Sequence, residues 1–259
     1  LDQGAVAVER ADLAGQAVET ETLRRTDRFR GALMNSVSHD LRTPLSTVLG
    51  ASTTLIDLGD KLKPAVRADL LLSIREEAER LSRYVGDLLD MTRLGSGQLR
   101  PRTDWVDLRD IVASAIERAK KLLRRRTVKV EIDPAVPLLR LDPMLMEQVV
   151  FNLLDNACKY SPPGTPVTVW AVARGDRVIV EVCDQGPGIA PEDRERIFDM
   201  FYRVEEGDSR TAGTGLGLAI CRGIVEAHGG RISAQPGLNG AGTCIVMRLP
   251  TAAPPEVVE

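Results

Sequence analysis

Two neighbouring segments of the chain repeat apolar residues at steps of four and three, which is the spacing of one face of an α-helix. The first repeat consists of Val37, Leu41, Leu45, Val48 and Leu55. The second consists of Leu70, Ile74, Ala78, Leu81, Val85 and Leu88. Between them lies a turn from Gly59 to Pro64, since glycine ends helices and proline begins them. We predict two helices of roughly 30 residues that pack as an antiparallel hairpin.

This hairpin accounts for residues 29–100, and one copy of it cannot cover both apolar stripes. Two copies can do so as a four-helix bundle, and we therefore predict a homodimer. Residues 1–28 are polar, rich in alanine and only weakly periodic. That segment suits a signalling helix that enters from an upstream sensor region.

The second half, residues 101–250, alternates between strand and helix patterns and holds most of the glycine and proline. The predicted strands are residues 127–132, 167–172, 177–183, 231–234 and 243–249, with a short extended piece at 138–141. The predicted helices are residues 143–160, 191–201 and 216–228. This order indicates an α+β fold, an α/β sandwich in which a mixed sheet carries helices on one face. Residues 251–259, rich in proline and alanine, are expected to form a disordered tail.

Composition excludes several classes of partner. With 34 basic and 37 acidic residues the net charge is −3, which gives no reason to expect a polyanion binder. Aromatic residues make up only 3%, which disfavours stacking on single-stranded nucleic acid. One basic run is interpreted as a solvated helix end, so no nucleic-acid partner is predicted; it comprises Arg118, Lys120, Lys121, Arg124, Arg125, Arg126 and Lys129. The four cysteines, Cys158, Cys183, Cys221 and Cys244, form no CxxC pair and are expected to be buried, reduced thiols.

One histidine stands out by its position. His39 is two residues from both Val37 and Leu41, so it lies off the buried stripe and faces water. An exposed imidazole beside a carboxylate, here Asp40, can act as a nucleophile. The alternative is a surface histidine beside a surface charge. The second histidine, His228, precedes two glycines at a helix end and is assigned a structural role.

Four polar residues share one face of the predicted helix 143–160, because they follow the spacing i, i+4, i+7 and i+8. They are Asn152, Asn156, Lys159 and Tyr160. Carboxamide oxygens suit Mg²⁺, and an ammonium group can neutralise phosphate. The alternative is an ordinary solvated face, although asparagine is a poor helix former.

Three further clusters suit the same kind of ligand. Asp184 ends a strand and can accept a hydrogen bond from an adenine amino group, while Gly186 and Gly188 let the backbone approach a ligand closely. A helix opens after three glycines whose N–H groups suit anionic oxygens: Gly213, Gly215 and Gly217. Arg203 begins a polar segment, 204–211, that is expected to act as a lid near phosphates. Each cluster alone could be an ordinary turn.

Together and in this order, the clusters resemble the motifs of the sensor histidine kinases of bacterial two-component systems, over about residues 28–250. The details look most like the Kdp-type, potassium-responsive members. The resemblance implies that residues 101–250 bind ATP with Mg²⁺ and that His39 accepts the γ-phosphoryl group. It implies that Asp40 is the adjacent acid/base. It also implies that Thr43 helps to place water when the partner is dephosphorylated.

The same resemblance assigns the remaining roles. Asn156 would ligate Mg²⁺ with support from Asn152, and Lys159 and Arg203 would contact phosphates. Tyr160 would line the nucleotide pocket and Asp184 would bind adenine. The partner would be the receiver domain of a response regulator. The chain would be the cytoplasmic core of a parent anchored in the bacterial inner membrane, attached only through upstream segments. Two rivals remain open: an ATPase that drives conformational change, and a scaffold without catalysis.

Overall fold

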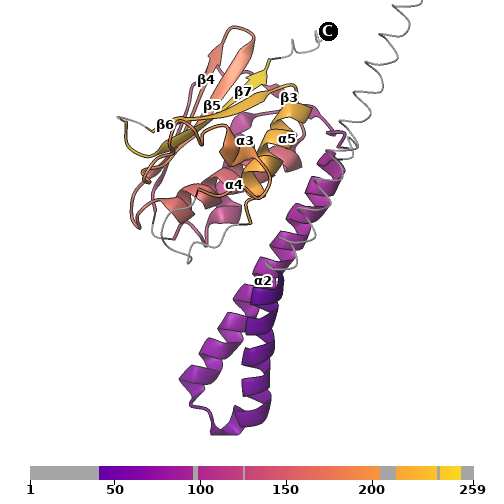
Figure 1. Ribbon diagram of the computed structural model, residues 1–259. Coiled ribbons are helices and arrows are strands. Elements are labelled where there is room, and N and C mark those ends of the chain that lie inside the picture. The colour runs from indigo at the N-terminus through magenta and orange to yellow at the C-terminus, as the bar shows by residue number, and fades with distance from the viewer. Residues whose placement is uncertain (1–40, 96–98, 125, 205–213, 238–239, 252–259) are drawn as a thin grey trace, which may run out of the picture. The chain divides into compact units, whose positions relative to one another are not determined.

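The computed structural model describes residues 41–95, 99–124, 126–204, 214–237 and 240–251 (Figure 1). By its contacts the chain divides into two compact units, Leu1–Gly86 and Asp87–Glu259. Several predictions fall outside the described residues. These are the roles of His39, Asp40 and Gly213, the helix at 1–28, all but the first residue of the lid at 204–211, and all but the first residue of the tail at 251–259.

The first unit is the predicted helical hairpin. Residues 41–58 are helical, and a short 3₁₀ turn, η1 (Gly59–Lys61), leads into α2 (Pro64–Gly95), which begins at the expected proline. Ala51 and Tyr84 are buried in the hairpin. Leu45 and Val85, which belong to the predicted stripes, are exposed in the single chain.

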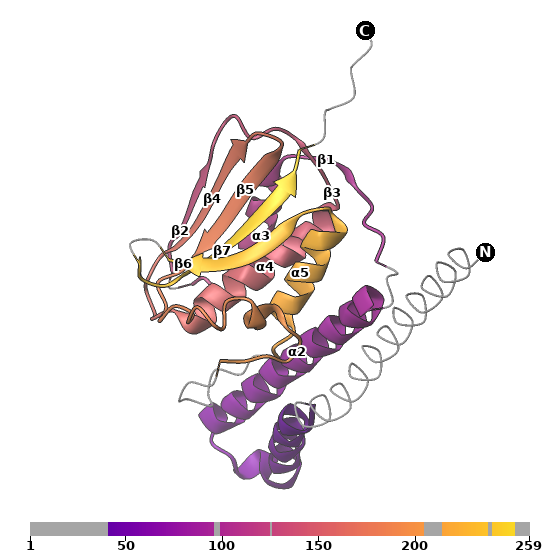
Figure 2. The same cartoon turned by 45° about the horizontal axis from the view of Figure 1, so that its top comes forward.

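The second unit contains a five-stranded sheet in the order β2-β4-β5-β7-β6 (Figure 2). Its strands are β2 (Val128–Ile132), β4 (Val167–Arg174), β5 (Arg177–Cys183), β7 (Thr243–Pro250) and β6 (Arg231–Pro236). β2 pairs with β4 in parallel, and the other pairs are antiparallel, so the sheet is mixed as predicted. A separate two-stranded ladder joins β1 (Asp104–Val106) to β3 (Leu139–Leu141).

Three helices lie on one face of this sheet: α3 (Leu108–Ala119), α4 (Pro143–Tyr160) and α5 (Gly217–Ala227) (Figure 1). Helices on one face were expected, although α3 was not among the predicted ones. Residues of β5 and β7 that point toward them are buried, namely Val178, Val180, Val182, Ile245, Met247 and Leu249. The Asp142 side chain accepts hydrogen bonds from the N–H groups of Met144 and Leu145 and so caps the first turn of α4. The predicted bounds of α4 and β5 are confirmed.

The predicted helix at 191–201 is wrong. The segment forms turns and a 3₁₀ helix of three residues, η2 (Arg196–Phe198). Its charged run, 192–196, offers no apolar face, and Phe201 adopts a positive φ of 61° that a helix does not allow. Sequence reasoning also missed β1 and α3, although α3 carries a clear signal. Asp107 caps it, and Leu108, Ile111, Val112, Ala115 and Ala119 are its buried face.

The expectation of four reduced cysteines is half wrong, because Cys183 and Cys244 form a disulfide and only Cys158 and Cys221 are free. The two bonded residues are 61 positions apart in sequence but directly opposite in the register of β5 and β7. Burial raises the pKa of the Cys221 thiol to about 12, so this thiol stays protonated at neutral pH.

His228 has the structural role that was predicted. Its Nδ1 donates to the carbonyl of Ile224 at 2.8 Å, and its Nε2 accepts from the N–H of Asp142 at 3.0 Å. Both ring nitrogens are therefore used in joining the end of α5 to the start of α4. None of the described helices combines the length and hydropathy that crossing a membrane requires.

Candidate functional site

Helix α4 supplies one wall of the candidate site. Its inner face is fixed in the core by buried apolar side chains: Met146, Val149, Val150, Leu153, Leu154 and Ala157. The predicted polar face is present on the same helix. Asn152 and Asn156 are partly buried, whereas Lys159 and Tyr160 are exposed at the last turn. The core thus holds the two carboxamides on a rigid element.

Lys159 has a partner that sequence reasoning did not anticipate. Its Nζ forms an ion pair with Oδ2 of Asp155, one helical turn earlier. The carboxylate is the more buried of the two groups. Any contact of Lys159 with a phosphate oxygen would therefore have to share this ammonium with Asp155.

Asn152 places a buried amide beside the start of α5. Its Nδ2 is buried and makes no hydrogen bond to a described oxygen or nitrogen atom, although the side chain interacts with the Cys221 thiol. A Cβ added at Gly217, the first residue of α5, would lie 4.0 Å from that nitrogen. A buried amide donor normally has an acceptor, and a helix N-terminus attracts anions. The pair therefore suits an anionic oxygen.

Asp184 lies directly after β5 and organises the loop that follows it. Its Oδ1 accepts hydrogen bonds from the N–H of Gly186 at 2.7 Å and from the N–H of Thr243 at 3.3 Å. Burial raises the pKa of this carboxyl group, although the two N–H donors partly oppose the rise. The second oxygen remains in a partly buried setting where a ligand donor can be bound strongly.

The glycine at 186 brings this loop against α4. A Cβ there would stand 2.7 Å from the carbonyl oxygen of Tyr160 and 3.0 Å from Oδ1 of Asp184, and neither can move freely. Gly188 has a positive φ of 85° and faces the carbonyl of Gly242. The structure thus brings Asp184, Gly186 and the end of the α4 polar face together.

Gly215, two residues before α5, packs directly against the backbone of Phe201, two residues before Arg203. The N–H of Phe201 donates to the carbonyl of Gly215 at 3.0 Å. A Cβ at Gly215 would lie 2.8 Å from the Phe201 backbone, and its φ is +68°. Arg203 is exposed two residues after Phe201. Phe198 is buried, whereas Phe201 is only partly buried.

An unpredicted set of contacts anchors η2 to α5. Arg222 on α5 forms an ion pair with Glu195 at 2.7 Å and lies 4.8 Å from the centre of the Phe198 ring. Asp193 accepts a hydrogen bond from the Tyr202 hydroxyl group. These contacts fix the chain immediately before Arg203. No sequence motif marked them, because they join residues from two separate segments.

Arg126 is the clearest functional residue that sequence reasoning missed. Its Nη2 donates to the carbonyls of Cys158 at 2.7 Å and Ser161 at 2.6 Å, and its Nη1 donates to the carbonyl of Pro162 at 3.0 Å. The interpretation of this arginine as part of a solvated helix end is wrong. It binds the carbonyl end of α4, where a cation also complements the helix dipole. Arg118, from the same run, lies over the Phe151 ring.

Replacing Arg126 with alanine should lower the free energy of unfolding by about 2 kcal/mol, because several charge-assisted, partly buried hydrogen bonds to backbone carbonyls are lost. Loosening the end of α4 should also weaken nucleotide binding. Urea unfolding and calorimetric titration measure the two effects. Arg124→Ala, at an exposed arginine two residues earlier, is the matched control and should change neither. If Arg126→Lys behaved like the wild type, this would contradict the role given to the guanidinium group, whose two terminal nitrogens donate to different carbonyls.

The described site has two chemically distinct ends. At one end a partly buried carboxylate suits an exocyclic amino group, and at the other a buried amide and a helix N-terminus suit anionic oxygens. Between them, Asn156 offers a neutral amide oxygen of the kind that Mg²⁺ accepts alongside phosphate and water oxygens. This donor set fits a purine nucleotide with a polyphosphate and Mg²⁺.

Fold and site together define an ATP-binding domain of a known class. Residues 141–253 match the family described as "Histidine kinase-, DNA gyrase B-, and HSP90-like ATPase". Residues 29–97, which contain the hairpin, match the "His Kinase A (phospho-acceptor) domain". The chain belongs to the two-component sensor histidine kinases and carries their conserved pair of core domains.

Individual relatives agree with this membership. The sensor protein KdpD of Clostridium acetobutylicum is 36% identical over 92% of this chain, which supports the expected Kdp-type resemblance. The chain spans only 27% of that relative's length. A structure of the mycobacterial sensor histidine kinase MprB is 31% identical, with a TM-score of 0.51, and covers 57% of this chain and 97% of its own. Full-length ShkA in complex with AMPPNP is 30% identical, with a TM-score of 0.62, and covers 85% of this chain and 46% of its own.

Proposed function

We propose that this chain transfers the γ-phosphoryl group of ATP to His39 and then to an aspartate on the receiver domain of a response regulator. The observation that carries the proposal is the arrangement on α4. The polar face of α4 runs from the Asp184 loop to the start of α5. Within it, the buried Nδ2 of Asn152 makes no hydrogen bond to an oxygen or nitrogen atom of the described residues. The similarity to ShkA, whose structure contains AMPPNP, supports ATP as the ligand.

The residues of the second unit bind and orient the nucleotide. Asp184 would accept a hydrogen bond from the adenine amino group, and Tyr160 would line the pocket. Asn152, the N–H groups at Gly215 and Gly217, Lys159 and Arg203 would hold phosphate oxygens. Asn156 would hold Mg²⁺, which neutralises phosphate charge when bound. Phosphoryl transfer depends chiefly on such positioning and charge neutralisation.

The residues of the hairpin would receive and release the phosphoryl group. His39 would attack through one imidazole nitrogen while Asp40 orients the ring or accepts its proton. Thr43 is exposed on the described helix, and it follows His39 by four residues in sequence, the spacing that puts two residues on one face of a helix. We infer from this spacing that Thr43 positions water for dephosphorylation of the partner. An anchor in the bacterial inner membrane stays a prediction of the family resemblance.

The hairpin should form a homodimer. Several large apolar side chains of the first unit are exposed in the single chain, including Leu45 at 58%, Leu49 at 67% and Ile56 at 82%. Exposed apolar side chains gathered on one helix in this way are typical of an interface. Sedimentation should give twice the chain mass of 28.2 kDa. Leu49→Glu with Ile56→Glu should give monomers, whereas Thr47→Glu, at an exposed position on the opposite side of the helix, should not; a monomeric wild type would contradict the proposal.

The experiment that tests the function is incubation with γ-labelled ATP and Mg²⁺. We expect label on the chain that is labile in acid and stable in alkali, as a phosphoimidazole is. Label that survives acid would indicate a different acceptor. Bound ATP without label would limit the chain to nucleotide binding.

A further inference from the structure

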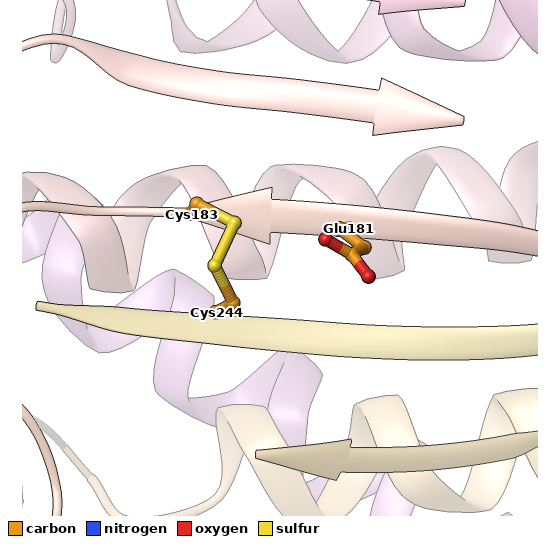
Figure 3. A group of neighbouring side chains, drawn as sticks. All are labelled: Glu181, Cys183 and Cys244. Carbon is orange, nitrogen blue, oxygen red and sulfur yellow. A yellow bond between two sulfur atoms is a disulfide. The ribbon is translucent and has the colours of Figure 1, made fainter. Parts of the chain in front are cut away.

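A disulfide lies beside the proposed adenine pocket. Cys183 is the last residue of β5 and Cys244 is the second residue of β7, and their sulfur atoms are bonded across the two neighbouring strands (Figure 3). Both residues are 4% exposed. Val246 is buried with them, and the partly buried Ile179 packs against the same cluster.

The disulfide joins two residues that are each next in sequence to a residue of the Asp184 hydrogen bonds. Asp184 follows Cys183, and Thr243 precedes Cys244. The N–H of Asp184 donates to the carbonyl of Thr243 at 2.8 Å, and the Thr243 N–H donates to the Asp184 carboxylate at 3.3 Å. A Cβ at Gly242 would clash with the carbonyl oxygen of Asp184. The disulfide therefore fixes the base of both loops that position Asp184.

The disulfide does not belong to the helix-packed core. Val180 and Val182 on β5 point toward the helices, so Glu181 and Cys183 point to the opposite face of the sheet. A carboxylate oxygen of Glu181 and the two sulfur atoms all lie within 4.8 Å of one another (Figure 3). A negative charge at this position repels the anionic thiolate through which disulfide exchange proceeds.

We propose that Cys183 and Cys244 are a redox modification site that tunes nucleotide affinity through the Asp184 loop. The proposal rests on the proposed function, because an ATP-dependent kinase works in a compartment where thiols are normally kept reduced. In that setting a disulfide is commonly a reversible one. The oxidised form holds both loops in the binding geometry, and reduction releases their base.

The exchange balances with glutathione disulfide as the oxidant. One cysteine thiolate attacks a sulfur of glutathione disulfide, forms a mixed disulfide and expels one glutathione thiolate. The second cysteine thiolate then attacks the protein sulfur, closes the Cys183–Cys244 bond and expels the second glutathione thiolate. The two protons of the cysteines leave with the two glutathione molecules. The protein loses two electrons and the oxidant gains them.

The test compares Mg-ADP affinity in reduced and oxidised protein. A variant with Cys158→Ser and Cys221→Ala keeps only the proposed pair, and a second variant carries Cys183→Ala and Cys244→Ala. Each is treated with dithiothreitol or glutathione disulfide, and alkylation with mass spectrometry records the thiol state. Calorimetry should show about fivefold weaker binding on reduction in the first variant and no change in the second, because preorganised loops bind at lower entropic cost. Equal affinity in both states would overturn the proposal.

Two further readouts separate this proposal from the proposed function. Amide hydrogen exchange at residues 184–188 and 240–243 should speed up on reduction even if the protein binds no ADP, and unchanged exchange would refute the redox role. Absence of ADP binding in either state would instead refute the nucleotide site. Glu181→Gln should accelerate oxidation by glutathione disulfide, since it removes the charge beside the thiols; an unchanged rate would contradict the role given to Glu181.

Discussion

Replacing His39 with glutamine should abolish labelling by γ-labelled ATP while leaving Mg-ADP affinity unchanged. Glutamine cannot form the phosphoimidazole, but the proposed binding residues all lie in the second unit. The loss should be complete, because no other histidine can substitute. The chain has two histidines, and both nitrogens of His228 are engaged in hydrogen bonds inside the fold.

Filter assays of acid-labile label, with calorimetry of Mg-ADP binding on the same preparations, decide this prediction. Thr53→Gln is a matched control, since it places the same side chain at an exposed position of the same hairpin. This control should label normally. Undiminished label on His39→Gln would show that the phosphoacceptor is a different residue. Loss of Mg-ADP binding together with label would show that the substitution disturbs folding.

Replacing Asp184 with alanine should weaken Mg-ADP binding on the order of 100-fold. The substitution removes the acceptor for the adenine amino group. It also frees the N–H groups of Gly186 and Thr243, so the loop is no longer held for the ligand. Asp176→Ala, at the exposed turn between β4 and β5, is the matched control and should bind like the wild type. Normal affinity in Asp184→Ala would exclude this carboxylate from the site.

The same residue gives the binding a pH dependence. Burial raises the pKa of the Asp184 carboxyl group, and protonation removes the negative charge that strengthens the hydrogen bond from the adenine amino group. Affinity should therefore be full above that pKa and fall as the pH drops through it, starting at a higher pH than for an ordinary aspartate. Asp184→Asn, whose side chain does not titrate, should show no such fall.

Local signals predicted much of the fold. The bounds of α4 follow from Asp142 and Pro143 at its start and the Ser-Pro-Pro sequence at its end, where capping and backbone sterics act within a few residues. The strand β5 follows from alternation alone. The segment at 191–201 was misassigned because its conformation depends on Phe201 and Gly215, which meet only in the folded chain.

The candidate site divides in the same way. The polar face of α4 is a matter of helical spacing, so the sequence was sufficient to predict it. Arg126, Arg222 and the Cys183–Cys244 bond join segments distant in sequence, and no local pattern announces such partners. They depend on strand register and on how helix ends approach loops. Both are decided by packing of the whole domain.

Helix α4 is at once a core element and the proposed floor of the pocket, since its apolar side chains fill the interior and its amides face the ligand. Ligand binding in the pocket is therefore coupled to the folding equilibrium of the domain. A compound that binds only the folded form stabilises it by an amount that grows with the logarithm of its concentration divided by its dissociation constant, and the melting temperature rises accordingly. Inhibitors of this domain could thus be ranked by the rise in melting temperature that each one causes, without a phosphorylation partner in the assay.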